Sequence, residues 1–333
     1  MKSILHIAAP ARNFGDAALC WGLHKRLRDE AIEELRFTMV DIQATRFTDA
    51  QIGLINASFD AILVGGGGLV MDRSDVGNET RSGWQWDITR ELLWQIKVPL
   101  VVYAIGFNQL PYATSPVTKE ALQHLEDVAT KASAFSFRDE QSAWTCKMAG
   151  ADVVPDPALW VEPHGMWHCW SNPTKTLVGV NWAGDRVGQR WPDVTTAGQV
   201  HDRLMEALKA ANISAHLIPH HPDDMTIGDG SDIVPSYFNV PLLAGVYEAT
   251  DVAIGTRGHA NIIAAAVGTP PISVGHQAKN RWFMESIGLV DNHIPDDATP
   301  TRIENIINDA IARRVTKPSP NHDFDRRVIE CLS

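Results

Sequence analysis

The stretch from Asp251 to Lys279 constrains the fold most, because it contains a complete strand–helix–strand unit. A buried strand is predicted over Val252–Gly255 and an apolar helix over 262–267. Gly268 and Pro270 are the expected stop signals of this helix. A second strand, Pro271–Val274, leads to another helix that begins near Lys279. Strands that alternate with helices in this way indicate an α/β fold.

A polar corner, Thr256-Arg257-Gly258-His259, separates the first of these strands from its helix. Helix N-termini bind anions through free backbone N–H groups and the positive end of the helix dipole. The corner adds a fixed cation and a titratable ring at this position. We therefore predict an anionic ligand that is held by Arg257, with His259 beside it.

Charge and cysteine content exclude several classes of function. The 333 residues carry a net charge of −11, which argues against non-specific binding to nucleic acid or to anionic lipid. The four cysteines show no paired metal spacing and favour a reducing, cytoplasmic compartment. The N-terminal apolar run is too short for a signal peptide, and no 18-residue apolar stretch occurs.

Strand–helix alternation continues through both halves of the chain. It predicts two doubly wound, Rossmann-like α/β domains that face a cleft. We expect an N-terminal domain over 1–165, a C-terminal domain over 175–312 and a tail, 313–333, that crosses back to the N-terminal domain. The Pro-, Gly- and aromatic-rich stretch 162–174 is the expected linker.

Polar or glycine-rich segments follow the predicted strands of the first half. In the loop after the first strand, Asp16 is either the N-cap of the next helix or a catalytic carboxylate. Gly65–Gly68 follow a buried strand and allow close approach to a ligand, or else form a tight turn. They match neither a Walker A loop nor GxGxxG.

Three further features of the first half are candidates for the site. The polar stretch 71–83 is either a mobile acceptor-binding loop or a plain surface insertion. Trp84 and Trp86 follow it and are candidate platforms for sugar rings. Arg138, just past a strand end, either faces the cleft or pairs with Asp139.

Histidines and acidic residues of the second half follow another strand, as His220-His221-Pro222-Asp223-Asp224. We favour a cleft-lining role for His220 or His221 without a metal; the alternative is a turn that Asp223 or Asp224 caps. His164, His168 and Cys169 match no standard zinc spacing, so no metal site is predicted.

The ordered set of motifs resembles the polysaccharide pyruvyl transferase family from residue 13 to about residue 289. The motifs are Asn13-Phe14-Gly15-Asp16, Gly65-Gly66-Gly67-Gly68-Leu69, Ser136-Phe137-Arg138-Asp139 with Ser142, Asp156-Pro157-Ala158, Thr256-Arg257-Gly258-His259, the run 264–270 and Lys279. Each motif is short, but their order and spacing are specific. Gly258 departs from the family, which usually has a bulkier residue there.

This resemblance implies a GT-B-type fold, with phosphoenolpyruvate as donor, a sugar as acceptor and a pyruvate ketal as product. No metal or organic cofactor is implied. The roles that follow are His259 as general acid, Asp16 or His220 as base, donor binding by Arg257, Lys279, Arg138 and Thr256, and acceptor binding by Asn13, Gly66, Gly67, Gly68, Trp84 and Trp86.

Two other functions are compatible with the same residues. One is a nucleotide-sugar glycosyltransferase of the same architecture, which also places a basic corner on a diphosphate. The other is a non-catalytic carbohydrate- or anion-binding protein. By family analogy the acceptor is compatible with a lipid-linked saccharide and with transient association at the inner membrane surface. Nothing in the sequence indicates an oligomeric state.

Overall fold

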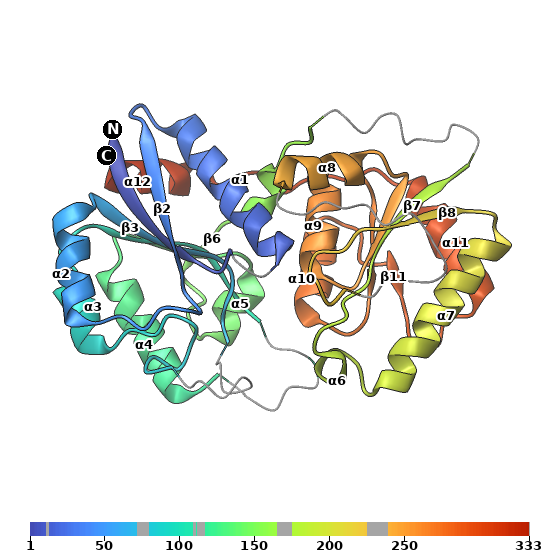
Figure 1. Ribbon diagram of the computed structural model, residues 1–333, viewed down its shortest axis with the longest axis horizontal. Helices are drawn as coiled ribbons and strands as arrows, with labels where there is room; N and C mark the ends of the chain where they lie inside the picture. The colour runs from blue at the N-terminus through green and yellow to red at the C-terminus, as the bar shows by residue number, and fades with distance from the viewer. Residues whose placement is uncertain are drawn as a thin grey trace.

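The computed structural model describes residues 1–10, 13–71, 80–108, 111, 117–164, 175–224 and 239–332. Two parallel sheets form the centres of two α/β units, which lie side by side in Figure 1. The first sheet has the order β2-β1-β3-β4-β5-β6 and the second the order β11-β10-β9-β7-β8. The predicted doubly wound α/β class is confirmed.

The first unit contains, in chain order, β1 (Lys2–Ala8), α1 (Phe14–Glu30), β2 (Leu35–Asp41), α2 (Asp49–Ser58), β3 (Ala61–Val70), α3 (Arg90–Gln95), β4 (Leu100–Phe107), α4 (Lys119–Lys131), β5 (Ala134–Phe137), α5 (Glu140–Thr145), β6 (Asp152–Val153) and the 3₁₀ helix η2 (Pro157–Trp160). The alternation of side chains along β1 explains why both faces of the sheet are covered. Leu5 and Ile7 pack in one core with residues of α2, α3 and α4. Ile4 packs in another core with residues of α1.

The second unit contains β7 (Leu177–Asn181), α6 (Val187–Arg190), α7 (Val194–Ala210), β8 (Ser214–Leu217), α8 (Val240–Glu248), β9 (Val252–Gly255), α9 (Gly258–Ala266), β10 (Pro271–Val274), α10 (Ala278–Ser286), β11 (His293–Ile294) and α11 (Pro300–Ile311). Helices α7 and α11 pack against one face of its sheet, and α8 and α9 belong to a second apolar cluster. The strand–helix–strand unit predicted over Asp251–Lys279 is therefore confirmed as β9, α9 and β10.

The last helix, α12 (His322–Leu332), lies on the first unit, beside α1 (Figure 1). Phe324 and Val328 are fully buried in the same core as Ile4. Asp325 is also buried and accepts hydrogen bonds from Tyr103 Oη at 2.5 Å and Arg26 Nε at 2.9 Å. The chain after α11 thus returns to the first sheet and is fixed there by packing and by a buried charge.

Helix α1 also joins the two units, because its other residues share an apolar cluster with α8 and α9. The backbone N–H of Phe14 donates to the carbonyl oxygen of His220 at 3.0 Å. Gly15 makes this approach close: a Cβ atom at this position would overlap the side chain of His259. The N-terminus of α1 therefore meets the N-terminus of α9, where the anion-binding corner was predicted.

Two features differ from the sequence predictions or lie outside the described residues. The glycine run Gly65–Gly68 is the second half of β3 and not a loop after it, because these residues continue the pairing with β4. Most of the predicted acceptor loop (72–79) and of the predicted linker (165–174, with His168 and Cys169) is not described. Within the described ranges, no helix is long and apolar enough to cross a membrane.

Candidate active site

A cavity of about 300 Å³ is lined by residues that follow, or end, strands of both sheets. The first unit contributes Asn13, Asp16, Gly66, Gly68, Asn108 and Arg138, and the second contributes Asp185, Arg190, Arg257, His259 and Lys279. Ligands of doubly wound sheets bind at the carboxyl edge of the strands. This cavity is therefore the candidate active site, and its volume suits a compact ligand.

His259 lies in the first turn of α9, between two carboxylates from the first unit. Its Nδ1 is 3.7 Å from Oδ1 of Asp16, and its Nε2 is 3.5 Å from Oδ2 of Asp156. Neither Nε2 nor that Oδ2 has a hydrogen-bond partner in the described structure. Both distances exceed a normal hydrogen bond, as is common in catalytic sites before the substrate tightens them.

The two carboxylates differ in acidity. Loss of water around Asp16 raises its pKa, and the attraction of His259 and Lys279 only partly offsets this effect. Burial acts in the same direction on Asp156, but His259 and Arg138 outweigh it, so the pKa of Asp156 is lowered. Asp156 therefore stays charged and orients His259, whereas Asp16 is better suited to accept a proton.

Asp16 is free for this role because the N-cap of α1 is Asn13, whose side chain accepts a hydrogen bond from Gly15 N at 2.8 Å. The interpretation of Asp16 as an N-cap is wrong. His259 does not cap its own helix either: the N-cap of α9 is Arg257, and no side chain caps this helix. Asp16 and His259 thus lie 3.7 Å apart in the lining of the cavity.

Lys279, in the first turn of α10, provides a cation whose protonation state changes near neutral pH. Its Nζ donates to Oδ1 of Asn108 at 2.8 Å, which links the two units. Loss of water and then the nearby charges of Arg138 and Arg190 lower the pKa of Lys279 to about 7. An anion that enters the cavity would compensate these charges and favour the ammonium form.

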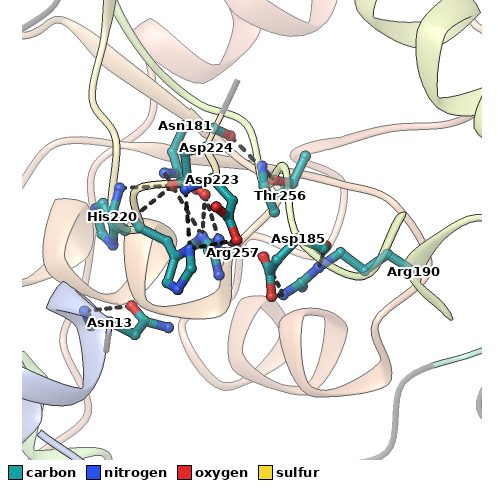
Figure 2. A network of polar contacts seen from close by, with 12 residues as sticks. Asn13, Asn181, Asp185, Arg190, His220, Asp223, Asp224, Thr256 and Arg257 are labelled. Atoms are coloured by element: carbon teal, nitrogen blue, oxygen red, sulfur yellow. Dashed lines mark hydrogen bonds and ion pairs between the residues drawn. The ribbon is translucent and has the colours of Figure 1, made fainter. Parts of the chain in front are cut away.

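Arg257 is almost fully buried, and Figure 2 shows its guanidinium between two aspartates. Its Nε donates to Oδ1 of Asp224 at 2.9 Å, and its Nη2 donates to Oδ1 of Asp185 at 2.5 Å. Asp185 also faces Arg190, whose Nη2 lies 3.3 Å from each of its carboxylate oxygens. Asp185 thus lies between two arginines, whose guanidinium groups match carboxylates and phosphates alike.

Asp224 has a different role, because its carboxylate also accepts hydrogen bonds from the backbone of His220 and from Asn181 Nδ2 (Figure 2). It is 5% exposed and closes the turn after β8. The alternative of a capped turn at this segment is therefore confirmed, with Asp224 as the capping residue. The same carboxylate fixes the plane of the Arg257 guanidinium.

Arg138 follows β5 and faces the cavity while it also pairs with carboxylates. Its Nε is 3.3 Å from Asp139 Oδ2, and its Nη1 is 3.7 Å from Asp156 Oδ2. Asp139 is in addition the N-cap of α5. The two alternatives considered for Arg138 are thus both present in the structure.

The structure corrects two predicted roles in the second unit. His220 does not line the cavity: its buried ring lies 2.8 Å from Tyr247 Oη, and burial lowers the pKa of His220 to about 3. The neighbouring His221 lines the cavity instead. Thr256 is also directed inward, where its Oγ1 accepts from Ala183 N at 2.7 Å and stabilises the strand ends.

Trp84 and Trp86 are not the exposed sugar platforms that we expected. Both are fully buried in the core of the first unit, and their rings meet edge to face. Trp84 Nε1 donates to His124 at 2.9 Å. Gly66 and Gly68 line the cavity as expected, whereas Gly67 does not belong to its lining.

Sequence reasoning missed Asp156, Asp185, Asn108 and Arg190. Asp156 belongs to the motif Asp156-Pro157-Ala158, to which no role was assigned, and it follows β6. Asn108 directly follows β4. The rule that strand ends carry ligands could therefore have identified both residues. Asp185 and Arg190 lie in a short irregular segment around α6 that has no sequence signal of its own. Within the described ranges, no three His, Cys, Asp or Glu side chains are grouped as a metal site.

Comparisons with known proteins agree on the fold. UDP-GlcNAc 2-epimerase from Methanocaldococcus jannaschii, in complex with UDP-GlcNAc and UDP, aligns with a TM-score of 0.58 at 9% identity over 99% of this chain and 98% of that chain. The UDP-GlcNAc 2-epimerase from Neisseria meningitidis aligns with a TM-score of 0.56 at 8% identity over 100% and 99%. These similarities show a GT-B-like fold. No curated protein matches the sequence.

The family model for polysaccharide pyruvyl transferases matches residues 13–277. This range covers most of the chain and includes the cavity residues from Asn13, the N-cap of α1, to His259 in α9. The protein therefore belongs to the polysaccharide pyruvyl transferase family.

Proposed function

We propose that this protein transfers pyruvate from phosphoenolpyruvate onto two hydroxyls of a saccharide, with a pyruvate ketal and phosphate as products. The observation that carries the proposal is the position of His259, between two carboxylates and beside a cation-lined cavity. Phosphoenolpyruvate is small, so a cavity of about 300 Å³ suits it.

The cavity wall supports binding of a compact polyanion. Arg138, Lys279 and Arg257 line it, and the N-termini of α1 and α9 add the positive ends of two helix dipoles. Arginine's planar fork matches both a carboxylate and a phosphate. Because Asp185 lies between Arg257 and Arg190, we expect the donor to compete with it for these arginines.

Protonation of the donor is the first chemical step. His259 delivers a proton to the methylene carbon of phosphoenolpyruvate, which becomes a methyl group and leaves the central carbon electrophilic. Asp156, whose Oδ2 lies 3.5 Å from Nε2, holds the orientation of the ring. The cations of the cavity compensate the negative charges of the donor's phosphate and carboxylate, so that the incoming hydroxyl meets less negative charge.

A first sugar hydroxyl then adds to the central carbon, and Asp16 takes its proton. A second hydroxyl displaces phosphate, which leaves with the proton of that hydroxyl and closes the ketal. Asp16 returns its proton through His259, so both groups recover their starting states. The raised pKa of Asp16 favours this transient protonation.

Phosphate release from phosphoenolpyruvate with a library of acceptor glycosides tests the proposal, with mass analysis for the pyruvyl adduct. His259→Gln should lose turnover by about 10²-fold or more and keep most of its affinity for phosphoenolpyruvate in calorimetry. His201→Gln, the same change on α7, serves as the matched control and should retain turnover. Near-normal turnover of His259→Gln would reject the assignment of the acid.

Calorimetric titration with a panel of UDP-sugars distinguishes the alternative function. Binding of a nucleotide sugar, together with glycosyl transfer and no response to phosphoenolpyruvate, would favour a glycosyltransferase. Saccharide binding without turnover of either donor would favour a non-catalytic relative.

A further inference from the structure

A second and larger cavity, of about 900 Å³, adjoins the candidate active site. The two cavities share Arg138, Gly258, His259 and Lys279 in their linings. From there the larger cavity extends between α10, the first turn of α5 and the segment 318–323 that precedes and begins α12. A ligand in the larger cavity would thus contact the same histidine that faces the donor cavity.

The wall provided by α10 carries two aromatic side chains, Trp282 and Phe283, which are both partly exposed. Partly exposed aromatic faces bind the C–H faces of sugar rings, because such rings are apolar above and below and polar at their edges. Trp84 and Trp86 cannot serve in this way, because both are fully buried. Trp282 therefore offers a partly exposed aromatic face in the cavity that His259 also lines.

Carboxylates and amides surround these aromatics. Glu140 and Gln141 of α5 line the cavity, as do Asn321 and Asp323 at the start of α12. Carboxylate and amide oxygens accept hydrogen bonds from hydroxyl groups, and amide nitrogens donate to them. The hydroxyl groups at the edge of a sugar ring can therefore form hydrogen bonds with these side chains while the faces of the ring pack against the aromatic side chains.

The distribution of charge argues against an anionic occupant for the outer part of this cavity. Its cations, Arg138 and Lys279, lie at the end shared with the donor cavity. The walls farther out contribute Glu140, Glu285 and Asp323. A nucleotide diphosphate would be repelled there, whereas a neutral saccharide would not.

Helix α5 continues the same surface outward. Trp144 is 70% exposed, and it is placed three and four residues after Gln141 and Glu140, hence on the same helix face. An exposed tryptophan one turn beyond the cavity lining suits a second sugar ring. The available length thus fits an oligosaccharide better than a single sugar.

We propose that the larger cavity is the acceptor subsite, in which Trp282 stacks on the sugar that is modified and Trp144 contacts a neighbouring sugar. This proposal rests on the proposed function, because it assumes that the two sugar hydroxyls that receive the pyruvate lie next to His259. Segment 318–323 forms one of its walls, so the return of the chain to the first unit contributes directly to acceptor binding.

Saccharide binding in the absence of donor tests the subsite. The probes are methyl glycosides of glucose, galactose, mannose and N-acetylglucosamine and their β-linked disaccharides, measured by saturation-transfer NMR and calorimetry. We expect Trp282→Leu to weaken binding of the best probe by about tenfold, as loss of one stacking contact should. Trp282→Phe should recover most of the affinity, which separates stacking from folding.

Trp94→Leu is the matched control, because Trp94 is 48% exposed on α3 and does not line either cavity. It should bind the probe as the unmodified protein does.

Two binding results would overturn the subsite. One is an affinity for the best probe that is unchanged in Trp282→Leu, and the other is the absence of binding of every probe to the unmodified protein. Pyruvyl transfer in which Trp282→Leu leaves the KM for the acceptor unchanged would overturn the subsite and leave the proposed function intact. Trp282-dependent binding without transfer from phosphoenolpyruvate would support the subsite and reject the proposed function.

Discussion

Replacement of Asp185 by asparagine should weaken the fold and strengthen donor binding at the same time. The neighbouring Arg190 and Arg257 overcome the effect of burial and lower the pKa of Asp185 from 3.8 to about 2. A shift of this size corresponds to about 2 kcal/mol, which solvent at the cavity wall reduces to about 1–2 kcal/mol. A carboxylate with a lowered pKa stabilises the folded state above about pH 4, and this contribution is lost as the pH falls toward 2.

Asp185→Asn should therefore lower the free energy of unfolding at pH 7 by about 1–2 kcal/mol, as measured by urea denaturation. The donor would no longer displace a carboxylate from the two arginines, so its affinity should rise by about tenfold in calorimetry. Asp202→Asn, at an aspartate whose side chain is 83% exposed, should change neither quantity. An affinity for phosphoenolpyruvate that stays equal or falls in folded Asp185→Asn would refute the role of Asp185 as a competitor for the donor.

Three other changes test separate parts of the site. Asp156→Asn should lower kcat by about 10²-fold with little change in donor affinity, because His259 loses the carboxylate at Nε2; steady-state kinetics would show this split. The affinity for phosphoenolpyruvate should fall as the pH rises through 7 and Lys279 loses its proton, and calorimetry should show a flatter dependence for Lys279→Arg. Gly15→Ala should destabilise the fold by about 1–3 kcal/mol, because its methyl group meets His259; Gly53→Ala, in α2 with open space around it, should be neutral or stabilising in the same denaturation assay.

Local patterns predicted the fold well where apolar runs ended in clear stop signals. The bounds of β9 and β10 and the end of α9 follow from Val252–Gly255, Pro271–Val274 and Gly268. Helix α9 begins at Gly258, four residues before the apolar run 262–267, because the polar corner already contributes its first turn. The glycine run was harder, because glycine permits both a turn and an extended strand, and only pairing with β4 decides between them. Tertiary contacts therefore override the local signal at this point.

The site could be predicted only in part, for a related reason. Strand ends identified Asp16, Arg138, Arg257 and His259, because parallel strands bring their carboxyl ends to one edge. Burial cannot be read from the residue type alone. Trp84 and Trp86 were therefore predicted as sugar platforms and His220 as a cleft-lining residue, although the core encloses all three. Contacts such as Asp185 with Arg257 join positions more than 70 residues apart, and no local pattern reveals them.

Deuterium incorporation tests the central claim most directly. The reaction of phosphoenolpyruvate with an acceptor glycoside would be run in D₂O, and the saccharide product analysed by mass spectrometry and NMR. If His259 protonates the methylene carbon with an exchangeable proton, the pyruvate ketal should carry a single deuterium in its methyl group, and phosphate should appear in equal amount. An adduct without deuterium in the methyl group, or transfer of a glycosyl group in place of pyruvate, would contradict the account.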